Sequence, residues 1–310
     1  MLPDDESVPA TIASDDATPL NVEPAADPVS VLAPATQTVP LIFASPHSGA
    51  DYPAEFVAGA RLDPLTLRRS EDAFVDEIFA AAPDHGAPLL RAHFPRAYVD
   101  PNRERYELDP RMFADALPSY VNTASPRVAA GLGTIARVVT SGDYIYRDKL
   151  TFAEAKQRID MCYGPYHDTL GGLIEATRRH FGACLLIDCH SMPSVGGPMD
   201  RDPGLKRVNM VLGDGHGSTC AKAVVDLAEA TLDDLGFVVT RNNPYAGGFT
   251  TRHYGRPETG VHTLQIEINR ALYMDEVAVS RGAGLPALAA NMERLIAILA
   301  DAAPALLHTA

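Results

Sequence analysis

Long apolar segments are missing from this sequence of 310 residues. No stretch approaches the roughly 20 apolar residues that a membrane-spanning helix needs. The opening residues, MLPDDESVPATIASDD, have neither the basic segment nor the apolar core of a secretory signal. We therefore expect a cytoplasmic protein that neither crosses nor binds a membrane.

Cysteines are also scarce, and several well-known motifs are absent. The four cysteines form no CxxC pair, which argues against a disulfide scaffold and against a thiolate zinc site. No GxGxxG follows a strand-like segment and no phosphate-binding loop is present, so nothing supports nucleotide binding. No serine lies in a GxSxG elbow, which weakens a serine-hydrolase interpretation. The HExxH motif of many zinc proteases is also absent.

Positive charge is outweighed by negative charge. The chain has 26 Lys and Arg residues against 40 Asp and Glu residues, for a formal net charge of -14. This balance disfavours nucleic acid and anionic membranes as partners. A small anionic substrate is still compatible with it, because one or two local arginines can bind a carboxylate.

The first part of the chain differs in composition from the rest. Residues 1–37 contain no Lys, Arg or aromatic residue and are rich in Pro, Ala, Asp and Glu. Such a segment buries too little apolar area to offset the entropy of ordering it, so we expect a disordered tail. We expect residues 38–310 to form one catalytic domain, and a monomer is compatible with the sequence.

Apolar and amphipathic segments alternate along the remaining chain. Strands are expected at 39–44, 88–92, 183–188, 208–212, 238–240 and 262–268. Helices are expected at 63–82 with a break near Ser70, at 152–180 with an interruption near Gly164-Pro165, at 220–234 and at 285–299. This alternation predicts a single α/β domain with a mixed or largely parallel central sheet and helices on both faces.

Two of the predicted strands run directly into histidine. The first ends at Ser45-Pro46-His47, and the second continues into Asp188-Cys189-His190. Ligands bind beyond the carboxyl ends of strands in such sheets, so a shared metal site is our preferred interpretation. Side chains alternate along a strand, which places Asp188 beside His190 as an orienting partner and turns Cys189 away. The alternative is that both histidines only cap strand ends.

A zinc hydrolase commonly adds one carboxylate to two histidines. Glu71 and Asp72 are the candidates, since Ser70 could cap a helix whose first turn holds Asp72. Acidic residues in a first turn often only complement the helix dipole, so this alternative stays open.

Glu267 lies on the polar face of a predicted strand, between Ile266 and Ile268. Apolar neighbours can raise the pKa of such a carboxyl and suit it to proton transfer. A salt bridge to Arg270 is the competing interpretation.

Substrate contacts are expected from two loops. Arg103, next to Asn102, suits bidentate binding of a carboxylate, although a loop arginine more often has a surface partner. Arg252 and His253 offer a second anchor. They follow Gly247-Gly248, which could act as the hinge of a mobile flap.

In this order, the motifs resemble those of the N-formylglutamate amidohydrolase family. The matching segments span about residues 39 to 275 and are Ser45-Pro46-His47-Ser48-Gly49, Glu71-Asp72-Ala73-Phe74-Val75-Asp76, Asp100-Pro101-Asn102-Arg103, Asp188-Cys189-His190-Ser191, Asn243-Pro244-Tyr245-Ala246-Gly247-Gly248 and Gln265-Ile266-Glu267-Ile268-Asn269-Arg270. The HxxE motif of related carboxypeptidases is missing, as it is from the whole family. Glu-Asp replaces the family's commoner Thr-Asp at positions 71 and 72.

The resemblance implies a zinc carboxypeptidase-like (phosphorylase/hydrolase-like) fold with one Zn²⁺ per chain. It implies that His47, Asp72 and His190 bind the zinc, that Glu267 is the general base and that Arg103 holds the substrate carboxylate. The expected reaction is hydrolysis of N-formylglutamate to formate and glutamate, as in histidine degradation. Alternatives are a zinc deacylase or carboxypeptidase-like enzyme for another N-acyl amino acid or short peptide, a non-catalytic metal- or ligand-binding protein, and a metal-free interaction protein.

Overall fold

A seven-stranded mixed sheet forms the centre of the protein, shown by a computed structural model that describes residues 27–307 except 199 and 201. The strand order is β1-β3-β2-β4-β7-β5-β6, and β2, β3, β4 and β7 run parallel to one another. Strand β1 is antiparallel to β3, and β5 is antiparallel to β7 but parallel to β6. The strand bounds are β1 Val29–Leu32, β2 Leu41–Ser45, β3 Leu89–Ala92, β4 Cys184–Met192, β5 Met210–Gly213, β6 Val239–Arg241 and β7 Val261–Asn269.

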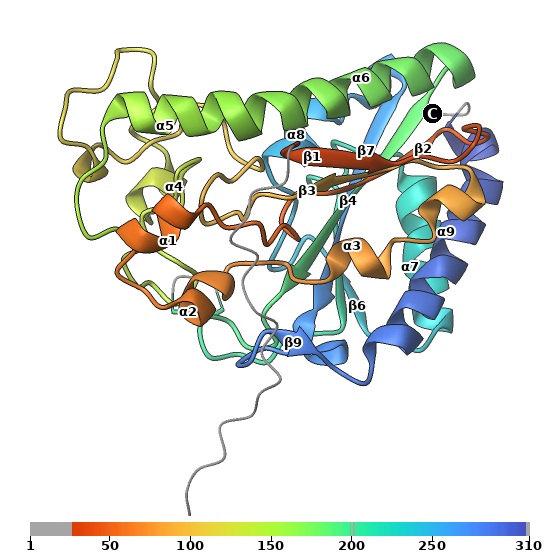
Figure 1. Ribbon diagram of the computed structural model, residues 1–310. Coiled ribbons are helices and arrows are strands. Elements are labelled where there is room, and N and C mark those ends of the chain that lie inside the picture. The colour runs from red at the N-terminus through yellow and green to blue at the C-terminus, as the bar shows by residue number, and fades with distance from the viewer. Residues whose placement is uncertain (1–26, 199, 201, 308–310) are drawn as a thin grey trace, which may run out of the picture.

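Helices cover both faces of this sheet, as the sequence predicts. Figure 1 shows α5 and α6 along one side and α3, α7 and α9 along the other. The α-helices are α1 Ala54–Gly59, α2 Pro64–Arg68, α3 Val75–Ile78, α4 Pro126–Ala129, α5 Phe152–Arg158, α6 Gly164–Phe181, α7 Lys222–Asp234, α8 Phe249–Tyr254 and α9 Leu285–Leu307. Short 3-10 helices span Ala82–His85, Pro110–Met112, Pro257–Thr259 and Arg270–Leu272, and the pair β8 Met274–Asp275 and β9 Ser280–Arg281 forms a small hairpin.

The alternation of side chains in β2 divides the core into two layers. Leu41 and Phe43 pack with α3, α7 and α9, whereas Ile42 and Ala44 pack with α5 and α6. Every residue of β2, β4 and β7 is buried. This burial explains why the central strands read as nearly continuous apolar runs rather than as alternating ones.

The expected boundary of a disordered tail at residue 37 is wrong. Residues 1–26 lie outside the described part, but Val29–Leu32 forms strand β1 and pairs with β3, with Val29 opposite Ala92. The prediction rests on the composition of residues 1–37 as a whole. That average hides the short apolar run Val-Ser-Val-Leu, because the residues around it are mostly polar or small. The open edge of β3 supplies the hydrogen-bonding partner that orders it.

One helical prediction needs correction, and another is confirmed at its start and at its break. The interruption near Gly164-Pro165 is absent, because a π-helical turn over Ile159–Tyr163 joins α5 to α6 and Pro165 falls in the first turn of α6. The segment 63–82 does start at Asp63, whose carboxylate accepts a hydrogen bond from Thr66 N. The break near Ser70 is also present, because α2 stops at Arg68 and Phe74, with a left-handed φ of 65°, precedes α3.

Within the part of the chain that the structure describes, no helix is both long enough and apolar enough to cross a membrane.

Candidate metal centre

Parallel neighbouring strands bring the two predicted histidines to one edge of the sheet. His47 follows β2, His190 lies in β4, and β2 pairs with β4 in parallel. Asp72 lies in the link between α2 and α3, where its backbone N–H donates to His47 O over 2.9 Å. Asp72 is therefore held beside His47 by the backbone, not in the first turn of a helix capped by Ser70 as expected.

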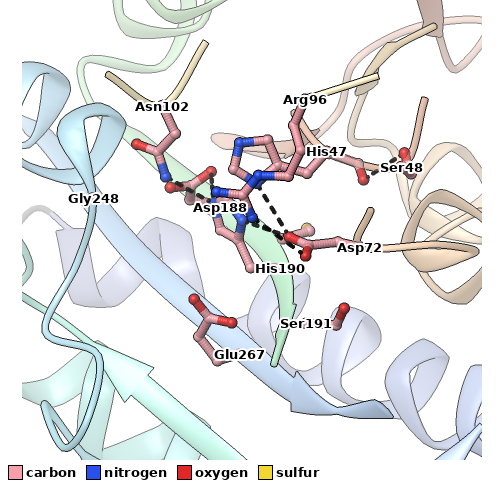
Figure 2. A network of polar contacts seen from close by, with 12 residues as sticks. His47, Ser48, Asp72, Arg96, Asn102, Asp188, His190, Ser191, Gly248 and Glu267 are labelled. Carbon is pink, nitrogen blue, oxygen red and sulfur yellow. Dashed lines mark hydrogen bonds and ion pairs between the residues drawn. The ribbon is translucent and has the colours of Figure 1, made fainter. Parts of the chain in front are cut away.

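Three donor atoms converge at this edge (Figure 2). Asp72 Oδ2 lies 3.2 Å from His47 Nδ1 and 3.0 Å from His190 Nδ1, and one donor atom from each residue falls within 4.8 Å of the others. All three residues are at most 2% exposed. Two imidazole nitrogens and one carboxylate oxygen are a ligand set that suits a divalent transition metal, and it leaves a coordination position open.

Carboxylates occupy the far side of both histidine rings. His47 Nε2 lies 2.8 Å from Asp100 Oδ1, and His190 Nε2 lies 3.0 Å from Asp188 Oδ1. A carboxylate at Nε2 fixes the ring orientation and leaves Nδ1 free as a ligand. The sequence predicts this role for Asp188 but not for Asp100, although Asp100 also follows an apolar pair, Tyr98-Val99.

The charges around the three residues favour a cation. Burial alone would raise the pKa of Asp72, but the hydrogen bonds with His190 and His47 hold it well below its ordinary value. Burial opposes a charge on His190, yet the neighbouring Asp188 raises the pKa of that ring well above its usual range. Arg270 Nη2 donates to Asp72 Oδ1 over 2.9 Å, so Asp72 keeps Oδ2 directed at the two rings.

Glu267 faces the same cavity from the adjacent strand. In the parallel pairing of β4 with β7 it lies directly opposite His190, and Gln265 Nε2 donates to its Oε1 over 2.7 Å. Burial raises the pKa of Glu267 to about 8. A carboxyl group whose pKa is raised in this way can both accept and return a proton near neutral pH.

Comparisons with known proteins agree with this geometry. The model of the N-formylglutamate amidohydrolase family matches residues 39–274. The chain belongs to this family.

Two related proteins and one crystal structure resemble this chain over most of their own length. An N-formylglutamate deformylase of Pseudomonas aeruginosa is 31% identical over 77% of this chain and 84% of its own, and one of Pseudomonas putida is 27% identical over 77% and 83%. The crystal structure of N-formylglutamate amidohydrolase from Ralstonia eutropha JMP134 superposes with a TM-score of 0.82, at 37% identity, over 88% of this chain and 97% of that one. The predicted family and fold class are confirmed.

The geometry separates Asp72 from its neighbour Glu71. The Glu71 carboxylate turns away from the histidines, accepting hydrogen bonds from Tyr52 OH over 2.7 Å and from Arg68 Nε over 3.1 Å. Asp72 alone of the two completes the donor set in this family member.

The predicted substrate-binding residues divide into two groups. Arg103, Asn102 and Arg252 line a cavity of about 560 Å³ that also contains the three metal-site residues and Glu267. His253 is not among the described residues that line it. On α8 it lies four residues after Phe249, and the two rings stack at 4.8 Å, as side chains at this spacing can.

The predicted glycine hinge is closely packed. Gly247 has a φ of 116°, which a side chain rarely adopts. Gly248 donates its N–H to Gln265 Oε1 over 2.8 Å, and a Cβ at this position would come within 2.2 Å of the Asn102 amide. Asn102 Oδ1 in turn accepts from Thr250 N over 2.8 Å. Backbone conformation and close packing therefore give a second reason, besides a hinge, for glycine at positions 247 and 248.

The Asp100→Asn substitution should weaken metal binding by about 10- to 100-fold, because the far nitrogen of His47 loses its carboxylate partner. Competition against a chromophoric chelator measures this change. Asp234→Asn is the control, since Asp234 is exposed at the end of α7 and does not line the cavity. Equal affinity in both variants would exclude an orienting role for Asp100.

Proposed function

We propose that this chain is a zinc-dependent amidohydrolase that cleaves N-formylglutamate to formate and glutamate. The observation that carries the proposal is the convergence of His47, Asp72 and His190 beside the buried carboxyl of Glu267. Relatives named for deformylation of N-formylglutamate, at 31% and 27% identity, support this choice of substrate.

Zinc fits the residues that are present. His47 Nδ1, His190 Nδ1 and Asp72 Oδ2 would hold one ion, and the donor set of two imidazoles and a carboxylate is that of known catalytic zinc sites. When bound, zinc lowers the pKa of water towards about 7 and polarises a carbonyl oxygen.

Glu267 supplies the proton transfers in this proposal. Its carboxylate takes a proton from the water as the water oxygen bonds to the acyl carbon. It returns that proton to the nitrogen as the C–N bond breaks, so that formate and a free amine leave. Positioned acid–base groups of this kind contribute roughly 10²- to 10⁴-fold to a rate.

Arg103 is the proposed anchor for the α-carboxylate. Its Nε donates to Leu132 O over 2.8 Å and its Nη1 donates to Asn102 O over 2.7 Å. These bonds hold the guanidinium at the cavity wall, while each Nη atom keeps a further N–H for a ligand. Asn102 and Arg252 lie on the same wall and are proposed to contact the substrate as well. A fixed carboxylate orients the acyl group towards Glu267.

Release of free amine by the zinc-loaded protein, with formate measured as well for the formyl compound, tests this proposal. N-formylglutamate, N-acetylglutamate and a dipeptide of glutamate are compared, and we expect rapid hydrolysis of the formyl compound only. Hydrolysis of another member of the panel but not of the formyl compound would contradict the formyl specificity. Bound zinc without any hydrolysis would indicate a binding protein, and no bound metal would indicate an interaction protein. A cytoplasmic location and a place in histidine degradation complete the proposal.

A further inference from the structure

Arginines are numerous in the wall of the cavity, although the chain as a whole is acidic. Among the described residues, six arginines and five carboxylates line it, whereas the protein as a whole has a formal net charge of -14. The arginines are Arg96, Arg103, Arg127, Arg207, Arg252 and Arg270.

Four of these arginines have carboxylate partners. Arg96 and Arg103 share Asp100, at 2.9 and 3.3 Å. Arg270 pairs with Asp72 at 2.9 Å, and Arg207 pairs with both Asp200 and Asp202 at 2.7 Å. Each of these four arginines therefore has at least one carboxylate within ion-pair distance.

Among the residues that the structure describes, Arg127 and Arg252 have no carboxylate within ion-pair distance. Arg252 Nη1 donates only to the backbone oxygen of Gly247, over 3.0 Å. The Arg127 side chain forms no hydrogen bond or ion pair within the described part of the chain, although it lines the cavity. Desolvation lowers the pKa of Arg127 most, the more distant carboxylates of Asp100 and Glu107 raise it, and the charges of Arg96 and Arg252 lower it. Both residues are exposed and line the same cavity, so a ligand that enters it can reach both guanidiniums.

Backbone contacts hold Arg127 beside Arg103. Arg127 O accepts from Leu132 N over 2.8 Å, and Leu132 O accepts from Arg103 Nε over 2.8 Å. The helix that carries Arg127, α4, is capped by Ser125, whose Oγ accepts from Val128 N over 3.0 Å and donates to Glu107. The backbone of Arg127 is therefore held beside Arg103 before any ligand binds.

We propose that Arg127, together with Arg252, forms a second anion site that binds the side-chain carboxylate of the substrate. This inference rests on the proposed function, in which Arg103 holds the α-carboxylate. Two cationic sites on one wall make the enzyme selective for N-acyl derivatives of dicarboxylic amino acids. A neutral side chain would leave these two guanidiniums without a counter-ion from the substrate, and a site built for a polar group rejects an analogue that lacks it.

Kinetics with two substrates of nearly equal shape test the second site. N-formyl-L-glutamate and N-formyl-L-glutamine are compared with wild-type protein, Arg127→Gln and the control Arg294→Gln, which changes an exposed arginine of α9 outside the cavity. We expect Arg127→Gln to lower kcat/KM for the glutamate derivative by about 100-fold, and that for the glutamine derivative by less than about threefold. Arg127→Lys should keep an intermediate preference, because an ammonium retains the charge but not the planar pair of donors.

Equal losses on both substrates, or no loss on either, would overturn the second anion site while leaving the proposed hydrolysis intact. Failure of the wild type to hydrolyse either compound would instead contradict the proposed function. Calorimetry tests the second anion site independently of catalysis. It compares the affinities of the protein for L-glutamate and for L-glutamine. Tighter binding of glutamate by the wild type, lost in Arg127→Gln, supports the second site, and equal binding of both overturns it.

Discussion

Glu267→Gln is expected to keep its metal and to lose about 10²- to 10⁴-fold in kcat for formate release. The amide has nearly the shape of the carboxyl group, and its oxygen can still accept the hydrogen bond that Gln265 Nε2 donates. It cannot accept a proton from water, and it has none to return to the leaving nitrogen. The loss should therefore appear in kcat rather than in substrate binding.

Parallel measurements of metal content and formate release distinguish this outcome from a damaged site. Glu258→Gln is a matched control, because Glu258 is exposed in a 3-10 helix and does not line the cavity. The control should behave as the wild type. If Glu267→Gln retains more than about a tenth of the wild-type kcat, Glu267 is not the general base.

Asp72→Asn is expected to lose the metal on dialysis and to lose its activity with it. The substitution should weaken metal binding by more than the roughly 10- to 100-fold that removal of an outer partner causes, since it removes a direct ligand. It also changes the group that both histidine rings face. The carboxylate of Asp72 only accepts hydrogen bonds, whereas the amide of asparagine includes an NH₂ donor. Elemental analysis after dialysis measures the metal, and circular dichroism checks that the protein stays folded.

Glu71→Gln is the informative neighbour for this experiment. Glu71 is buried against Arg68 and Tyr52, so the substitution should reduce the free energy of unfolding by about 3 kcal/mol. It should leave the metal content unchanged, because the Glu71 carboxylate does not face the histidines. Loss of metal from Glu71→Gln but not from Asp72→Asn would reverse the assignment of the third ligand.

Much of the metal centre follows from the sequence because its parts lie at the ends of buried strands. Apolar runs before His47 and His190 place both residues at the carboxyl edge of a parallel sheet, where side chains from different strands meet. The alternation of β7 likewise puts Glu267 on the face opposite the core residues Leu264, Ile266 and Ile268. These inferences use only the periodicity of a strand.

Residues outside regular elements could not be placed in this way. Asp72 owes its position to the left-handed Phe74 and to a backbone bond with His47, and neither leaves a periodic signal. Asp100 and Arg127 lie between β3 and α5, where the chain forms only short helices and turns. Their partners depend on the path of those turns, so the outer carboxylate of His47 and the unpaired arginine emerge only from the structure.

The most direct test of the central claim is the location of the bound metal. Crystals of the zinc-loaded protein are measured on both sides of the zinc absorption edge, and the difference in anomalous scattering locates the ion. We expect one peak per chain, about 2.0–2.2 Å from His47 Nδ1, His190 Nδ1 and Asp72 Oδ2, beside Glu267. A peak elsewhere, or none with these three side chains ordered, would contradict the metal centre and the hydrolysis built on it.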